Sequence, residues 1–151
     1  MRKPAGKGFP IYSRSHFLLS VGVGLVAGLY AGLDLLTGLG WVAFAAVVGV
    51  GIDVDHFLVA WYNTGDPRAI RYCLRHPRAV FTDQGSIFRP HEISKLDRLL
   101  SHMLIGGPLV AVLWVVSPTL AALAAAALYV HVVADLVQDI RDVRGSGESL
   151  G

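Results

Sequence analysis

Long uncharged runs are the feature that most limits the folds open to this chain. Residues 17–33 form a 17-residue run without a charged side chain, and residues 35–52 form an 18-residue run. Across the 36 residues of 99–134, the only ionisable side chains apart from tyrosine are two histidines. A helix of about 20 apolar residues crosses the hydrocarbon of a bilayer. These runs therefore predict helices that span a membrane.

Turn-forming residues divide the runs into two helical hairpins. The segment 37–40, Thr-Gly-Leu-Gly, is expected to turn the first hairpin, and Ser117-Pro118 the second. We predict an all-α integral membrane four-helix bundle that forms one domain over 1–151. Its helices are expected at roughly 16–36, 39–56, 92–116 and 119–140, with a helical cytoplasmic connection over 57–91. Glycines at four-residue spacing can pack within the chain or between copies in an oligomer: Gly24, Gly28 and Gly32.

The composition agrees with a membrane protein and excludes several other classes. Apolar residues make up 54% of the chain and charged residues 16%, against about 25% charged in typical soluble proteins. This excludes an intrinsically disordered chain, and the single cysteine, Cys73, excludes an internal disulfide. Two alternatives stay open. In one, the first run is a signal peptide; in the other, the helices form the core of a soluble bundle.

The basic residues predict an orientation. All thirteen Lys and Arg lie before residue 17, between residues 52 and 99, or after residue 134. Such residues stay in the cytoplasm, so we expect a multi-pass protein of the cell (inner) membrane with both termini cytoplasmic. Its partners are then membrane lipids. Four arginines share one helical face, which indicates either contact with anionic phospholipid or a solvated face: Arg68, Arg71, Arg75 and Arg78. We expect no nucleic acid partner, because stacking aromatics are not interleaved with them.

Ionisable side chains gather at the cytoplasmic level of all four predicted helices. Such groups are costly in spanning helices and mark function. Seven are predicted metal ligands: His16, Asp53, Asp55, His56, His102, His131 and Asp135. The i,i+3 pair Asp53 and His56 and the i,i+4 pair His131 and Asp135 each project from one helical face. Taken singly, each residue also fits an ordinary capping or hydrogen-bonding role.

The donor types predict the metal and its use. Histidine and carboxylate without a usable thiolate favour zinc, with manganese or iron as alternatives. Seven groups exceed the four ligands of one tetrahedral ion, which suits either two ions or one ion with supporting residues. Asp55 is the expected general base or bridging ligand. Arg98, one turn before His102, is expected to hold an anionic substrate group and stabilise charge in the transition state.

Four short motifs follow one another along the chain. They are His16, Gly-Ile-Asp-Val-Asp-His at 51–56, Arg-Leu-Leu-Ser-His-Met at 98–103, and His-Val-Val-Ala-Asp at 131–135. Their order resembles that of a family of small membrane-bound metal-dependent hydrolases, the inner-membrane-associated hydrolases. That family has Pro-Asp-x-Asp-His in the second motif and Arg-Gly-x-Thr-His-Ser in the third. This chain departs from those motifs at four positions: Ile52, Leu99, Ser101 and Met103. The resemblance implies a metal-dependent hydrolase without specifying its substrate.

We therefore expect an integral-membrane metal-dependent hydrolase that acts at the cytoplasmic interface. Its substrate is expected to be a phosphoester or lipid-like molecule, attacked by a metal-activated water. The alternative is a non-enzymatic membrane protein with a structural metal site, or a small cation or proton carrier. Carriers place ionisable groups near the bilayer midplane, whereas these groups gather at one interface, which favours the hydrolase.

Overall fold

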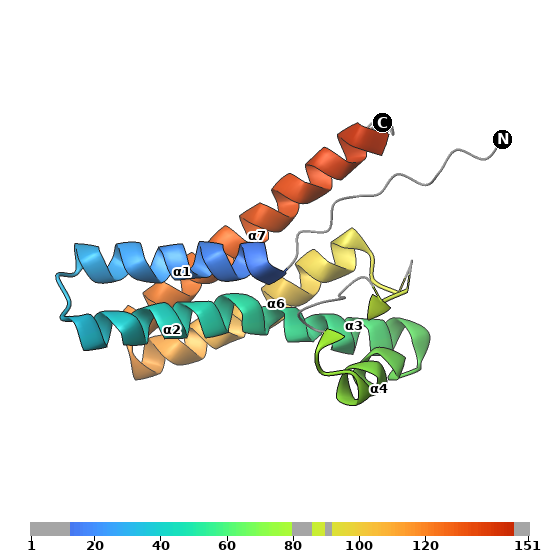
Figure 1. Ribbon diagram of the computed structural model, residues 1–151, viewed down its shortest axis with the longest axis horizontal. Helices are drawn as coiled ribbons and strands as arrows, with labels where there is room; N and C mark the ends of the chain where they lie inside the picture. Colours follow the sequence, from blue (N-terminus) through green and yellow to red (C-terminus); the bar gives the residue numbers. More distant parts are fainter. Residues whose placement is uncertain (1–12, 80–85, 90–91, 147–151) are drawn as a thin grey trace.

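The computed structural model describes residues 13–79, 86–89 and 92–146 (Figure 1). Within these ranges every regular element is a helix, so the predicted all-α fold is confirmed there. The helices are α1 (Ser13–Tyr30), α2 (Leu35–Gly51), the 3-10 turn η1 (Ile52–Val54), α3 (Asp55–Thr64), α4 (Arg68–Arg75), α6 (Lys95–Val116) and α7 (Pro118–Ser146). Residues 80–85 and 90–91 of the predicted connection lie outside the described residues.

The helices pack as two antiparallel pairs. α1 lies against α2, α6 lies against α7, and α7 also contacts both α1 and α2. α3 continues from the end of α2, and α4 folds back beside it (Figure 1). The first turn of α1, η1 and the first half of α6 lie toward the end of the molecule that carries α3 and α4. Side chains far apart in sequence can therefore meet at this end.

The first hairpin turns at residues 31–34, so the turn predicted at 37–40 is wrong. Gly32 adopts a φ of +62°, a backbone conformation that glycine allows readily. The carboxylate of Asp34 caps α2 by accepting hydrogen bonds from the backbone N–H of Thr37 at 3.2 Å and from its hydroxyl at 2.6 Å. α1 therefore ends at Tyr30 rather than 36, and α2 begins at Leu35 rather than 39.

The second helix is longer than predicted. α2, η1 and α3 form one helical segment from Leu35 to Thr64, so the end predicted at 56 is wrong. Gly65 ends it with a φ of +69°, and its N–H donates to the carbonyl of Trp61 over 2.8 Å. Asp53, Asp55 and His56 interrupt the apolar run, but residues 57–62 are apolar or aromatic again and the backbone continues as a helix until Gly65 ends it.

The second hairpin turns where the sequence predicted. α6 ends at Val116 and α7 begins at Pro118, with Ser117 between them. Ser94 and Asp97 form a capping box at the start of α6, three residues after the predicted start at 92. α7 extends to Ser146, beyond the predicted end at 140.

Small residues let the helices approach closely. A Cβ added to Gly24 on α1 would lie 2.6 Å from the Cα of Val42 on α2. The core between the two hairpins consists of Ala45 on α2 with Leu123 and Ala127 on α7. Gly24 therefore packs within the chain.

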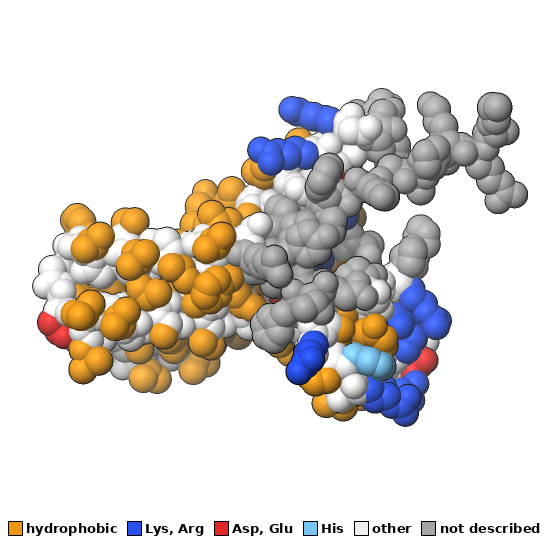
Figure 2. Space-filling model, in the orientation of Figure 1, with side chains coloured by type: hydrophobic (Ala, Val, Ile, Leu, Met, Phe, Trp, Pro, Cys, Tyr) orange, Lys and Arg blue, Asp and Glu red, His pale blue; other side chains and the backbone are white. Residues whose placement is uncertain are grey.

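The outer surface is apolar over most of its length. Leu29 is 80% exposed and Val115 is 86% exposed. Hydrophobic side chains cover the α1 and α2 side in Figure 2, whereas Lys and Arg gather at the end that carries α3 and α4. By length and composition three helical segments can cross a membrane: 35–64, 95–116 and 118–145. The apolar part of α1 is shorter, from Ser15 to Tyr30. A membrane location is therefore plausible.

Candidate metal centre

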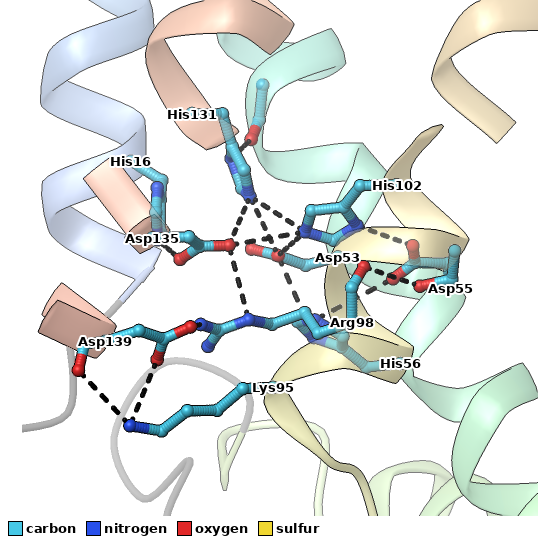
Figure 3. A network of polar contacts seen from close by, with 12 residues as sticks. His16, Asp53, Asp55, His56, Lys95, Arg98, His102, His131, Asp135 and Asp139 are labelled. Atoms are coloured by element: carbon cyan, nitrogen blue, oxygen red, sulfur yellow. Dashed lines mark hydrogen bonds and ion pairs between the residues drawn. The ribbon is translucent and has the colours of Figure 1, made fainter. Parts of the chain in front are cut away.

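The structure brings all seven predicted ligand residues to one place (Figure 3). They lie on five elements: His16 on α1, Asp53 in η1, Asp55 and His56 on α3, His102 on α6, and His131 and Asp135 on α7. All except Asp53 and His56 have exposed fractions of 4% or less. Ionisable groups at this depth need partners, so their contacts determine what the site can do.

Close packing of α1 on α2 helps to bring the candidate ligand residues together. A Cβ added to Gly49 on α2 would lie 1.9 Å from the hydroxyl oxygen of Ser20 on α1. Ser20 lies one helical turn after His16, so both face the interior from the same side of α1. Glycine at position 49 therefore leaves the room that His16 needs to reach α7.

Four atoms form the centre of the site, and we call them the four-atom cluster: Nε2 of His102, Nε2 of His131, Oδ1 of Asp53 and Oδ2 of Asp135. The two nitrogens lie 3.2 Å apart. Asp53 Oδ1 lies 3.3 Å from the His131 nitrogen and 3.8 Å from the His102 nitrogen. Asp135 Oδ2 lies 3.6 and 3.5 Å from the same two atoms. Ligand atoms around a tetrahedral zinc ion are separated by about 3.4 Å. Asp53, His102 and His131 therefore have spacings close to those of ligands to one ion, and Asp135 Oδ2 lies at a similar distance from both histidine nitrogens.

The remaining ring nitrogens determine which atoms carry protons. His102 Nδ1 lies 2.6 Å from Oδ2 of Asp55, and His131 Nδ1 lies 2.6 Å from the carbonyl oxygen of Gly49. Both contacts place a proton on Nδ1, because a carboxylate and a carbonyl only accept hydrogen bonds. The Nε2 lone pairs then point into the four-atom cluster. Metal-binding histidines are commonly oriented by this kind of contact.

The four-atom cluster needs positive charge among its members. It holds two imidazole lone pairs and two carboxylate oxygens, which repel one another unless protons or a cation lie between them. Oδ2 of Asp135 is buried and has no hydrogen-bond partner among the described residues. A buried carboxylate oxygen without a partner is costly, and coordination of a cation satisfies it. The residues therefore fit a metal ion.

His16 and His56 flank the four-atom cluster on two sides. His16 Nε2 lies 3.2 Å from Oδ1 of Asp135, and its ring stacks on that of His131 with centroids 4.0 Å apart. His56 lies 3.8 Å from Asp53 through Nδ1 and 3.8 Å from Asp55 through Nε2. Three overlapping trios can hold a metal ion: His16, His131 and Asp135; Asp53, His102 and His131; and Asp55, His56 and His102.

One side of the site is open to solvent. The side chains of Asp53 and His56 are 21% and 17% exposed, whereas that of His102 is 1% exposed. The ring of Phe88 meets His56 edge-on, with centroids 6.1 Å apart, and contacts Phe57 at 5.1 Å. Solvent therefore reaches the site beside η1 and α3, next to an aromatic surface.

The two predicted catalytic residues lie at the periphery. Asp55 contacts His102 on the side of the ring that faces away from the four-atom cluster. Arg98 donates from Nη2 to Oδ2 of Asp139 over 2.8 Å, and its Nε lies 3.5 Å from Oδ2 of Asp135. The guanidinium of Arg98 is thus engaged with carboxylates of α7.

Sequence reasoning missed three contributors. Asp139 binds Arg98, and Lys95 Nζ lies 3.7 Å from Oδ1 of Asp139. The spacing offered a signal, since Asp139 follows Asp135 by four residues and Lys95 precedes Arg98 by three. No sequence signal pointed to the carbonyl of Gly49, because every residue has a backbone carbonyl and the residue type does not show which one will contact a histidine.

Comparisons with protein-family models, with curated proteins and with solved structures found no match.

Proposed function

We propose that this protein is a metal-dependent hydrolase embedded in the cell membrane as a four-helix bundle, with its metal centre at the cytoplasmic face. The observation that carries the proposal is the four-atom cluster, whose two carboxylate oxygens lie at ligand-like distances from both histidine nitrogens, beside the partly exposed His56. The apolar surface of the helices supports insertion, and the basic residues at the end of the site support a cytoplasmic orientation.

Zinc is the ion we propose, held by Asp53, His102, His131 and Asp135. Two nitrogen and two oxygen donors suit zinc, and also suit manganese or iron. When bound, such an ion would supply a Lewis acid, and it would lower the pKa of a water molecule if one of the four donors yields its position to that water.

The chain's own residues have distinct tasks in this proposal. Asp55 holds the proton on Nδ1 of His102, and the Gly49 carbonyl holds the proton on Nδ1 of His131. His56 faces two carboxylates and is partly exposed, so it is placed to exchange a proton with solvent. This assigns proton transfer to His56 and an orienting task to Asp55.

We propose a phosphoester of an amphiphilic molecule as the substrate. The open side of the site lies beside Phe57 and Phe88, which can contact an apolar chain. Basic residues gather at the same end of the molecule, which favours an anionic headgroup. A membrane lipid combines these two properties.

A structural metal site is the second candidate, because the protein supplies a full set of four donors. Closed four-ligand sites are typically structural, whereas catalytic zinc keeps one position open. The two functions differ in what happens after metal removal. A structural ion is needed for the fold, whereas a catalytic ion is needed for turnover.

Elemental analysis of the detergent-purified full chain tests the metal centre. We expect near-stoichiometric zinc in wild type and loss of the metal in Asp53→Ala and His131→Ala. His76→Ala is a matched control, because this exposed histidine contacts Tyr72 and lies outside the cluster. A metal content that stays the same in Asp53→Ala and His131→Ala would contradict the proposed metal centre.

Activity toward a phospholipid or a chromogenic phosphodiester then tests the hydrolase. We expect chelation to abolish hydrolysis while the circular dichroism spectrum stays helical, and zinc to restore it. Loss of the helical fold on chelation would favour the structural site instead.

A further inference from the structure

α6 and α7 face each other through two successive layers of polar side chains. In the inner layer, His102 Nε2 lies 3.5 Å from Oδ2 of Asp135. In the outer layer, Arg98 Nη2 lies 2.8 Å from Oδ2 of Asp139. Arg98 and His102 are four residues apart on α6, and Asp135 and Asp139 are four apart on α7, so the layers lie in register.

Arg98 connects the two layers. Its Nε lies 3.5 Å from Oδ2 of Asp135, is buried, and has no hydrogen-bond partner among the described residues. The guanidinium is a planar fork, so a bond that fixes Nη2 also fixes the direction of Nε. Asp139 makes that bond and lies 3.7 Å from Lys95, which holds it from the other side.

Asp135 Oδ2 therefore has two competing sources of positive charge. One is a cation in the four-atom cluster, and the other is the Arg98 guanidinium. Asp139 balances the charge of Arg98, which leaves Asp135 available to the cation. Without the Asp139 carboxylate, Arg98 would have Asp135 as its nearest acidic partner and would draw this ligand away.

We propose that Asp139 is a positioning residue of the metal centre, which acts through Arg98 to keep Asp135 in place as a ligand. The inference rests on the proposed function, because a metal ion bound by the four-atom cluster is its premise. It assigns the outer layer of α6 and α7 to metal affinity rather than to contact with the substrate.

Zinc titration of the full chain in detergent, in competition with a chromophoric chelator, tests the role of Asp139. We expect Asp139→Asn to weaken zinc binding by about 10- to 100-fold, as is typical for groups that orient metal ligands. Asp139→Glu keeps the charge and should recover most of the affinity. Asp142→Asn is the matched control, because Asp142 lies on the same helix and accepts a hydrogen bond from Gln138 at 2.8 Å.

A double-mutant cycle tests whether Asp139 acts through Arg98. In an Arg98→Met background, Asp139→Asn should cause little further loss of zinc affinity. Arg98→Lys, which keeps the charge but lacks the planar fork, should bind zinc more weakly than wild type. Thermal unfolding of the zinc-free proteins verifies that each variant is folded.

The outcomes separate this inference from its premise. Wild-type protein that binds no zinc overturns the proposed centre and this inference with it. The inference alone is overturned if wild type binds zinc and Asp139→Asn binds it with the same affinity. It is also overturned if the losses of zinc affinity caused by the Arg98 and Asp139 substitutions are additive in the cycle.

Discussion

Gly49 serves the centre in two ways. Its carbonyl accepts the Nδ1 proton of His131 over 2.6 Å, and the lack of a side chain leaves room for Ser20. An added Cβ would lie 2.8 Å from Cβ of Ser20 as well as 1.9 Å from its hydroxyl oxygen, so rotation of the hydroxyl alone cannot relieve the overlap. Any side chain at position 49 must therefore separate α1 from α2.

We expect Gly49→Ala to destabilise the protein by about 1–3 kcal/mol, the range found for overpacked sites. Unfolding of the detergent-solubilised protein by heat or denaturant measures the change. Gly51→Ala is the matched control, because a Cβ at position 51 meets nothing within 4 Å. Ser20→Gly should restore stability to Gly49→Ala. Wild-type stability in the single variant would show that the helices are not in close contact here.

The candidate ligands could be predicted from sequence because they stand out against apolar runs. His102 and His131 interrupt a 36-residue stretch, and burial there is costly without a partner. Asp139 lies where α7 becomes polar, so its carboxylate resembles any surface acid in the sequence. The contact between Arg98 and Asp139 depends on the register of α6 against α7, which only the packed helices define.

The helix boundaries show which local signal prevails when two compete. Glycines at 38 and 40 predicted a turn, but Asp34 caps α2 four residues before Gly38. The Thr37 hydroxyl and backbone N–H hold the pKa of Asp34 below its usual range, so the cap is ionised at neutral pH. Glycine within a helix costs only about 1 kcal/mol relative to alanine, which capping and packing can offset.

The residues before α6 are tied to α4 by an ion pair between Arg68 and Glu92. Arg68 Nη2 lies 3.2 Å from Glu92 Oε2 and donates to the carbonyl of Ile87 at 2.7 Å. Burial opposes the charge on Glu92, but the backbone N–H of Arg89 and the guanidinium of Arg68 outweigh burial and lower its pKa. The ionised carboxylate therefore stabilises this connection.

This ion pair predicts a pH dependence of stability. A carboxyl group whose pKa is lower in the folded state stabilises the fold at neutral pH, and this contribution is lost as the pH falls below about 4.5. We expect Glu92→Gln to unfold at a lower temperature than wild type at about pH 7. The difference should shrink toward zero at about pH 3. A constant difference across this range would contradict the assignment to the charge of Glu92.

The whole molecule is polarised along its length. Apolar side chains cover the body formed by α1 and α2, while Lys and Arg gather over α3 and α4 (Figure 2). The turn at residues 31–34 lies at the end away from α4 (Figure 1). An orientation in which the helices cross a bilayer would place these two ends on opposite sides of it.

Cys73 on α4 provides a direct test of this orientation. We expect a membrane-impermeant maleimide to label it in inverted vesicles but not in intact spheroplasts. Burial raises the pKa of the Cys73 thiol, so labelling should accelerate as the pH rises. In a Cys73→Ser background, Ala31→Cys at the opposite turn should show the reverse pattern. Labelling of both sites from one side would contradict the orientation.

Each hairpin supplies only part of the four-atom cluster. Asp53 follows α2, whereas His102, His131 and Asp135 belong to α6 and α7. A shared ion would then act as a non-covalent cross-link, formed only after the two hairpins have associated. By linkage, free ion at about 100 times its dissociation constant would add about 2.7 kcal/mol to that association. The metal supply of the cell would thus affect how firmly the two halves of the protein hold together.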